Sequence, residues 1–236
     1  MRANRINGDN YMNSWSIEDE KRYFDDVASR TTLEEFKKRL DNRMNDALWP
    51  TIFGKIGNLM DRQVLDLGCG LGYDSAIFAS KGAKVVGIDI SSRCVEKAEL
   101  FLKSLGFERN TQFRVMDVRS LDFPEKHFDL VFGRRILHHI DLERCLKDVH
   151  HLVKDKCCFV EPFASNPIGG VSRTGHEVPA GESPKSVEIH PLPFLELSKL
   201  IQVMEKEFLD VWHKEYENNM ALIVTCARGK KSDYSI

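Results

Sequence analysis

The stretch VLDLGCGLG, residues 64–72, decides the fold. Its first four residues, Val64–Leu67, form a short apolar run that is typical of a buried strand. Three glycines follow at alternate positions, and glycine permits the positive φ angles and close backbone approach that a ligand-binding turn requires. A helical segment, Tyr73–Ser80, comes next. The order strand, glycine-rich turn, helix predicts the first unit of a parallel α/β sheet.

The chain after this stretch continues to alternate strands with helices. Strands are predicted at Lys84–Ile88, Gln112–Met116, Phe128–Phe132 and Cys157–Glu161, and helices at Ser91–Leu105 and Leu142–Val153. This alternation is typical of a parallel sheet with helices on both faces. After a helix near Phe194–Glu207, strands at Phe208–His213 and Ala221–Ala227 are close enough to pair as an antiparallel hairpin. We therefore predict an α/β, Rossmann-like, seven-stranded, mostly parallel sheet with an antiparallel C-terminal hairpin.

Three segments lie outside this alternation. Residues 1–60 begin polar and then carry helical spacing, so they predict an N-terminal helical cap of two or three helices. Within the α/β domain, residues 61–228, the segment 162–193 holds four glycines and six prolines and predicts a lid or substrate-binding insertion. Residues 229–236 predict a disordered tail.

Composition narrows the class of partner. The 34 basic and 36 acidic residues leave a formal charge of −2, so no nucleic acid partner is expected. The six cysteines contain no CxxC pair, which favours reduced thiols and gives no metal site. The sequence shows neither a secretory signal nor an apolar run of about 20 residues, so we expect a cytoplasmic protein without a membrane partner.

Polar residues follow the later strands. Asp89 ends the run VVGID, where a carboxylate accepts hydrogen bonds from both hydroxyls of a ribose; it would equally cap the helix near Ser91. Asp117 ends the third strand, where it can accept from an adenine amino group. Gly133 and Arg134 end the fourth strand. Because the carboxyl ends of parallel strands meet at one edge, these residues predict a nucleoside site.

These motifs resemble those of the class I S-adenosylmethionine-dependent methyltransferases, particularly the group that acts on small molecules. The matching segments are LDLGCGLG, VVGIDIS, VMDV, FDLVFGRRILHHI and FVEP. The resemblance implies S-adenosyl-L-methionine as the cofactor, bound by Asp66, Gly68, Gly70 and Gly72 at the turn and methionine side, Asp89 and Ile90 at the ribose, Asp117 and Val118 at the adenine, and Gly133 and Arg134 closing over it. The third glycine comes one residue earlier than in the GxGxxG of dinucleotide-binding proteins, which disfavours a nicotinamide cofactor.

Candidate catalytic residues lie after the fourth and fifth strands and in the insertion. His138 is a candidate base, preferred over His139 by analogy with the family. Glu161 closes the fifth strand, and His176 lies in the insertion. Each also has an ordinary interpretation, as helix packing or as a solvated loop.

The N-terminal helices are expected to cover the acceptor pocket. The aromatic candidates for its wall are Tyr11, Trp15, Tyr23, Phe24 and Trp49, and Arg39 or Arg43 is a candidate partner for the cofactor carboxylate. Packing in the core is the alternative fate of such aromatic residues.

The leading hypothesis is methyl transfer to a small-molecule acceptor by in-line displacement. The alternatives are a protein or RNA methyltransferase and a non-catalytic S-adenosylmethionine-binding accessory protein. The fourth strand is not followed by the Asn-Pro-Pro-Tyr or Asp-Pro-Pro-Tyr motif used by many enzymes that methylate amino groups of nucleic acids and glutamine. The accepting atom (oxygen, nitrogen or carbon) and the oligomeric state stay open.

Overall fold

A computed structural model of the chain describes residues 16–163, 196–216 and 220–226. The predicted insertion beyond Phe163, which contains His176, and the predicted C-terminal tail lie outside these residues. Among the described residues, no helix has the length and apolar character needed to cross a membrane.

Three helices precede the sheet: α1 (Ile17–Arg30), α2 (Leu33–Met44) and α3 (Leu48–Ile56). Both α1 and α2 begin with a capping box. The side chain of Ser16 accepts a hydrogen bond from the Asp19 N–H while the Asp19 carboxylate accepts from the Ser16 N–H. Thr32 and Glu35 do the same for α2. Local side-chain hydrogen bonds thus fix where α1 and α2 begin. The predicted N-terminal helices are confirmed.

The sheet has seven strands in the order β3-β2-β1-β4-β5-β7-β6. The strands are β1 (Gln63–Leu67), β2 (Lys84–Asp89), β3 (Thr111–Val115), β4 (Phe128–Arg134), β5 (Val153–Pro162), β6 (Leu209–Tyr216) and β7 (Met220–Cys226). The first five pair in parallel, whereas β7 pairs antiparallel with both β5 and β6. The predicted fold class, including the terminal hairpin, is confirmed.

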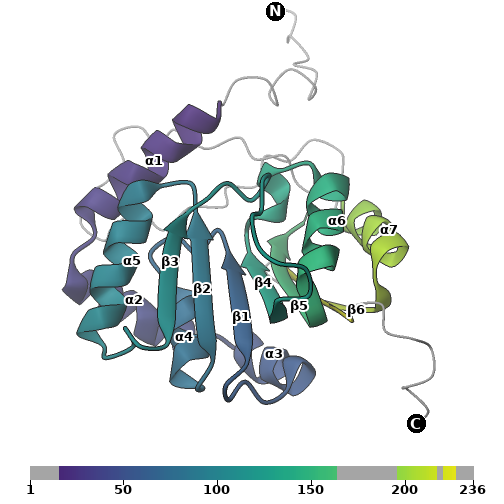
Figure 1. Ribbon diagram of the computed structural model, residues 1–236, viewed down its shortest axis with the longest axis horizontal. Coiled ribbons are helices and arrows are strands. Elements are labelled where there is room, and N and C mark those ends of the chain that lie inside the picture. The colour runs from purple at the N-terminus through teal and green to yellow at the C-terminus, as the bar shows by residue number, and fades with distance from the viewer. Residues whose placement is uncertain (1–15, 164–195, 217–219, 227–236) are drawn as a thin grey trace, which may run out of the picture.

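Helices cover both faces of the sheet. One face packs against α1–α3, α4 (Tyr73–Ser80) and α5 (Ser92–Ser104), and the other against α6 (Leu142–Leu152) and α7 (Leu197–Glu207). Neighbouring strand residues alternate between the two cores: Phe132 belongs to the first and Val131 to the second. Figure 1 shows α1 beside α5 on one side of the molecule, with α6 and α7 together on the other.

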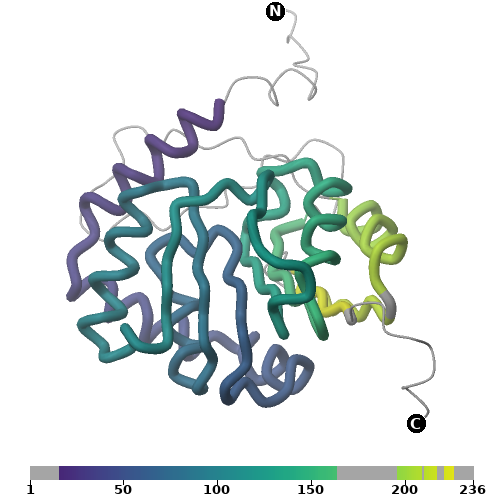
Figure 2. Tube along the Cα trace, in the orientation of Figure 1, coloured from purple at the N-terminus to yellow at the C-terminus, as the bar shows by residue number. Residues whose placement is uncertain are grey.

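Strand order sets where a ligand can bind. The chain passes from β1 outward to β2 and β3 and then returns to β4 on the other side of β1. The connection that follows β1 and the connection that follows β4 therefore run in opposite directions along the sheet and leave a crevice at the carboxyl ends of these two strands. Figure 2 lets this path be followed along the trace.

One element is longer than the sequence indicates. The predicted fifth strand begins at Cys157, whereas β5 begins at Val153, immediately after α6 ends at Leu152. Its first half contains the polar residues Lys154–Lys156, which interrupt the apolar run used for the prediction. Pairing with β4 extends back to Val153 nevertheless, so backbone hydrogen bonds outweigh the polar sequence here.

Candidate functional site

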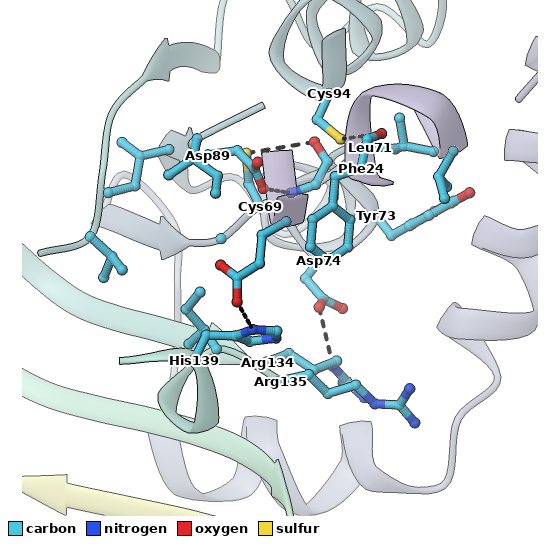
Figure 3. A pocket seen from close by; sticks show the side chains of 18 of the residues that line it. Phe24, Cys69, Leu71, Tyr73, Asp74, Asp89, Cys94, Arg134, Arg135 and His139 are labelled. Atoms are coloured by element: carbon cyan, nitrogen blue, oxygen red, sulfur yellow. Dashed lines mark hydrogen bonds and ion pairs between the residues drawn. The ribbon is translucent and has the colours of Figure 1, made fainter. Parts of the chain in front are cut away.

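A cavity of about 590 Å³ lies at the carboxyl ends of β1, β2 and β4, within the range of small-molecule sites. Its walls come from the glycine turn after β1, the residues after β2, β3 and β4, and the helices α1 and α2. The labelled side chains in Figure 3 include Cys69 and Asp89 from the turn and β2, Phe24 from α1, and Arg135 and His139 from the segment after β4. The cavity thus lies at the crevice that the topology creates.

The glycine turn exposes its backbone to the cavity. Gly70 has a φ of +52°, and a Cβ placed on it would meet no atom within 4 Å. Gly72, with a φ of +86°, begins α4, and a Cβ there would approach Leu102 Cδ1 to 2.9 Å. The turn therefore favours glycine at Gly70 because of the positive φ, and at Gly72 because of both the positive φ and the close packing against α5.

Asp89 organises the end of β2. Its Oδ2 accepts the Gly70 N–H at 2.9 Å and its Oδ1 accepts the Ser91 N–H at 2.9 Å. Burial raises the pKa of Asp89, although these two N–H donors act in the opposite direction. The side-chain cap of α5 is Ser91, whose Oγ accepts the Cys94 N–H. Asp89 thus supports the helix start and also lines the cavity.

Asp117 is held by a neighbour that sequence reasoning did not single out. Its Oδ1 accepts from the backbone N–H of Arg119 at 2.9 Å and from Nε at 2.8 Å. Burial alone would raise the pKa of Asp117, but the hydrogen bonds and charge of Arg119 bring it below its ordinary value. Both residues line the cavity, so this end of the site presents a paired carboxylate and guanidinium.

A buried ion-pair network closes the other end. Arg134 is 8% exposed; its Nε lies 3.1 Å from Asp74 Oδ2 and its Nη1 lies 3.3 Å from Asp46 Oδ2. The guanidinium also stacks over the ring of Trp49, 5.3 Å from its centroid. Arg43 approaches Asp74 Oδ2 at 3.6 Å. Among the described residues, Asp74 Oδ1 and Arg134 Nη2 are buried atoms without a hydrogen-bond partner.

Asp66 lies beneath the glycine turn and does not line the cavity. Its Oδ2 accepts the Ser75 Oγ–H at 2.6 Å. Burial, followed by the nearby charge of Asp74, raises the pKa of Asp66 to about 8. Its position indicates support for the turn from below.

The predicted cofactor residues divide into two groups. Seven line the cavity: Gly68, Gly70, Asp89, Ile90, Asp117, Val118 and Arg134. Asp66, Gly72 and Gly133 support it from behind; a Cβ on Gly133 would come within 2.7 Å of the Ile136 side chain. Their roles toward a cofactor stay predictions.

Helix α1 forms a wall of the cavity and is tied to α5. The Oγ–H of Ser91 donates to Asp25 Oδ1 at 2.6 Å, and the Sγ–H of Cys94 donates to the Phe24 carbonyl at 3.6 Å. Tyr23 and Phe24 line the cavity, as predicted for the aromatic wall. Trp49 does not: it is 3% exposed and packs in the core against Phe78 and Phe132. The remaining aromatic candidates, Tyr11 and Trp15, lie outside the described residues.

The segment after β4 is held by the end of β5. Arg135 has a φ of +57°, an uncommon conformation for a residue with a side chain, and its N–H donates to the Val160 carbonyl at 2.9 Å. The carboxylate of Glu161 accepts the N–H groups of Ile136 and Leu137 at 2.8 and 2.9 Å. These bonds fix which side chains of the segment face the cavity.

The two neighbouring histidines of η2 (Leu137–His139) point into different surroundings. His138 Nδ1 bonds Glu161 Oε2 at 2.8 Å; both side chains are 1% exposed, and neither lines the cavity. His139 lines the cavity and bonds Glu20 Oε1 through Nδ1 at 2.9 Å. The structure therefore puts the predicted catalytic residues His138 and Glu161 behind the wall, while His176 lies outside the described residues.

Sequence reasoning missed Glu20, Asp46 and Asp74. Glu20 and Asp46 reach their partners across 119 and 88 residues of chain, so no local pattern reveals them. Asp74 lies in the first turn of α4, directly after the glycine turn, and an acidic residue at that place is the signal that was available.

The central part of the chain is similar to known methyltransferases. Residues 64–156 match the family model described as a methyltransferase domain. The 27-O-demethylrifamycin SV methyltransferase of Amycolatopsis mediterranei is 30% identical over 148 residues, 62% of this chain and 48% of that protein. A tRNA U34 carboxymethyltransferase of Actinobacillus pleuropneumoniae is 33% identical over 96 residues, 40% of this chain and 30% of that protein.

Solved structures share the fold. The geranyl diphosphate C-methyltransferase of Streptomyces coelicolor, solved with Mg²⁺, geranyl-S-thiolodiphosphate and S-adenosyl-L-homocysteine, superposes with a TM-score of 0.65 at 11% identity, covering 79% of this chain and 77% of that one. Across the curated relatives compared, the matched region spans 30% to 48% of the relative's length. The family model begins at Val64 in β1 and therefore includes the glycine turn.

Proposed function

We propose that this chain is a class I S-adenosylmethionine-dependent methyltransferase, that it binds S-adenosyl-L-methionine and that it transfers the methyl group to a small-molecule acceptor. The observation that carries the proposal is the cavity where the open backbone of Gly70 and the carboxylate of Asp89 face the same space. An open glycine beside a strand-end carboxylate is the arrangement that accommodates a nucleoside in such sheets.

The residues present fit the proposed cofactor. Space beside Gly70 admits a ligand against the backbone, because even a Cβ there would touch nothing within 4 Å. The buried, unpartnered Asp74 Oδ1 suits an ammonium group, and the buried, unpartnered Arg134 Nη2 suits a carboxylate. The amino-acid arm of S-adenosylmethionine carries both groups. Asp74 and Arg134 therefore hold that arm in our proposal, Asp89 holds the ribose hydroxyls, and Asp117 with Val118 flanks the adenine.

When bound, S-adenosylmethionine supplies an electrophilic methyl group on a sulfonium. The chain has two further tasks: to orient the acceptor in line with that methyl group and to exclude water. Helix α1 serves both, because Tyr23, Phe24 and Val27 from this helix wall the cavity opposite the strand ends. Hydrogen bonds from Ser91 and Cys94 on α5 hold the helix in this position.

The size of the cavity and the position of α1 support a small acceptor. A wall helix over the strand ends leaves a confined space of about 590 Å³, which suits a cofactor and a compact acceptor. The near-neutral charge of the chain also gives no general electrostatic reason to expect a nucleic acid as the acceptor. The tRNA-modifying relative makes methylation of RNA the alternative outcome to test.

Calorimetric titration with S-adenosylhomocysteine tests the cofactor site. We expect Asp89→Ala to weaken binding by about 10- to 100-fold, because the ribose of the ligand loses hydrogen bonds to the carboxylate worth about 1.5–3 kcal/mol. Asp129→Ala is the matched control, since Asp129 also accepts a strand-end N–H, that of Gln63 at 2.8 Å, but does not line the cavity. Equal affinity of the Asp89 and Asp129 variants would contradict the ribose assignment.

Labelled methyl transfer tests the acceptor class. The wild-type chain is incubated with methyl-labelled S-adenosylmethionine and a cell extract, and the products are fractionated by size. Label in the low-mass fraction is the expected result. Label recovered only in RNA or only in protein would reject the small-molecule acceptor and support the corresponding alternative.

A further inference from the structure

Two histidine–glutamate pairs lie side by side on η2, and only one of them reaches the cavity. His138 and Glu161 are each 1% exposed and lie behind the wall. His139 and Glu20 are 7% and 16% exposed, and both line the cavity. The pairs have the same geometry, with Nδ1 to carboxylate oxygen distances of 2.8 and 2.9 Å. The two pairs therefore differ in whether they reach the cavity and not in the geometry of their hydrogen bond.

The glutamate sets the tautomer of His139. An ionised carboxylate accepts hydrogen bonds and donates none, so in a neutral imidazole the hydrogen belongs to Nδ1. The lone pair then lies on Nε2, which makes this nitrogen a proton acceptor. Among the cavity-lining residues that the structure describes, His139 supplies the only imidazole.

Both apolar and charged side chains line the cavity together with His139. Phe24 lies edge-on to its ring with centroids 6.5 Å apart, and Ile136 and Ile140 line the same cavity. Titratable or charged groups face it from three elements: Glu20 and Tyr23 on α1, Asp89 on β2, and Arg135 after β4. A single imidazole in this mixed lining suits an acceptor that carries one reactive polar group.

Resting on the proposed function, we propose that His139 is the catalytic base, that Glu20 is its positioning residue, and that the acceptor is a small molecule bearing a hydroxyl group. The hydroxyl O–H bond breaks and its proton passes to Nε2 of His139. The hydroxyl oxygen forms the new bond to the methyl carbon, while the carbon–sulfur bond breaks and its electron pair stays on sulfur. The imidazolium then releases the proton to water. A thioether or tertiary amine would need no such base.

Nitrogen-15 NMR of the imidazole side chains tests the tautomer without turnover. The wild-type chain, loaded with S-adenosylhomocysteine, should show His139 as the Nδ1-protonated tautomer. Glu20→Gln should shift it toward the Nε2-protonated form, because the amide NH₂ can donate to Nδ1. Glu20→Asp should restore the Nδ1-protonated form. A wild-type His139 protonated on Nε2 would overturn the inference.

Methyl transfer into the low-mass fraction of a cell extract tests the role of the base. We expect His139→Asn to lower the rate by about 100-fold or more and to remove the acid limb of the pH–rate profile. Glu20→Gln should lower the rate by about tenfold, with partial rescue by Glu20→Asp. His151→Asn, an exposed histidine outside this cavity, should match the wild type.

Binding of S-adenosylhomocysteine separates the two proposals. Both His139→Asn and Glu20→Gln should bind it within about threefold of the wild type. Normal binding together with a wild-type rate and pH profile in His139→Asn would overturn the base assignment and leave the cofactor site standing. A wild-type chain that does not bind S-adenosylhomocysteine would overturn the proposed function, and the base assignment with it.

Discussion

The two halves of the cavity are built in different ways. The strand-end half consists of the glycine turn and the ends of β2, β3 and β4. The hydrogen bonds of Asp89 and Asp117 in this half join residues that are near in sequence or on paired strands, such as Gly70 and Asp89. The helix half consists of α1 and η2, and its bonds join distant parts of the chain, such as Glu20 and His139. Hydrogen bonds between residues close in sequence or in sheet register shape the first half, whereas packing between distant segments shapes the second.

This difference assigns a task to each half. Strand ends that share a sheet register hold a ligand in a fixed place, which suits the invariant part of the reaction. A helix carried by contacts with its neighbours can differ in sequence while the sheet stays the same, which suits the recognition of an acceptor. The family model matches residues 64–156, which contain β1 to β4 and also η2 but not α1.

The largest expected effect comes from the support of η2. Glu161→Ala removes the acceptor of two backbone N–H groups and of His138 Nδ1 in a fully buried place. We expect the free energy of unfolding to fall by about 3–5 kcal/mol, since buried donors lose their partner. Urea unfolding measures it. Glu20→Ala, which breaks the equivalent pair at the cavity, should cost less, because the Glu20 and His139 side chains are 16% and 7% exposed; equal losses would refute the distinction between the two pairs.

A pH-dependent effect comes from beneath the strand-end half. The folded-state pKa of Asp66, about 8, lies above its ordinary value of 3.8, so the folded chain binds a proton that the unfolded chain releases. Between pH 4 and pH 8 this carboxyl group makes the folded state less stable as the pH rises, by up to about 1.4 kcal/mol per pH unit. Asp66→Asn should remove this slope.

Urea unfolding at pH 5, 6, 7 and 8 measures the slope. Asp66→Asn should gain stability relative to the wild type as the pH rises. Ser75→Ala is the matched control, because it removes the hydroxyl donor but keeps the carboxyl group. Stability curves of Asp66→Asn and the wild type that run parallel across this range would contradict the raised pKa.

The smallest expected effect on folding, with a clear effect on binding, comes from the glycine turn. Gly70→Leu and Gly106→Leu both put a side chain at a positive φ where a Cβ would meet nothing within 4 Å. Each should cost about 1–2 kcal/mol of stability from the backbone conformation alone. Gly70→Leu should also lower the affinity for S-adenosylhomocysteine by at least about tenfold, because its side chain enters the cavity. Calorimetry in which both variants bind alike would show that the ligand does not approach Gly70.

The strand-end half was largely predictable from sequence. The strand, glycine turn and Asp89 lie within one βαβ unit, and their spacing alone indicates that they meet. The sequence did not reveal which residues of these motifs face the cavity. Asp66 is buried beneath the turn, and Gly133 packs closely against the side chain of Ile136. Side-chain direction at a strand end depends on a one-residue alternation that motif matching ignores.

The helix half was not predictable in the same way. Sequence analogy favoured His138 over His139, but successive residues of a tight turn point in different directions, and here the second of them lines the cavity. The partner Glu20 comes from α1 and the partner Asp46 from the connection between α2 and α3, and the position of both depends on tertiary packing. Trp49 shows the same limit, since its aromatic ring predicts either a pocket wall or a core, and packing against Phe78 decides for the core.

A crystal structure of the chain with S-adenosylhomocysteine would test the proposed cofactor site without an intermediate step. We expect the ribose hydroxyls within hydrogen-bond distance of the Asp89 carboxylate, the amino-acid arm beside Asp74 and Arg134, and the nucleoside against Gly70. A crevice filled by side chains, or a nucleoside bound away from Asp89, would contradict it.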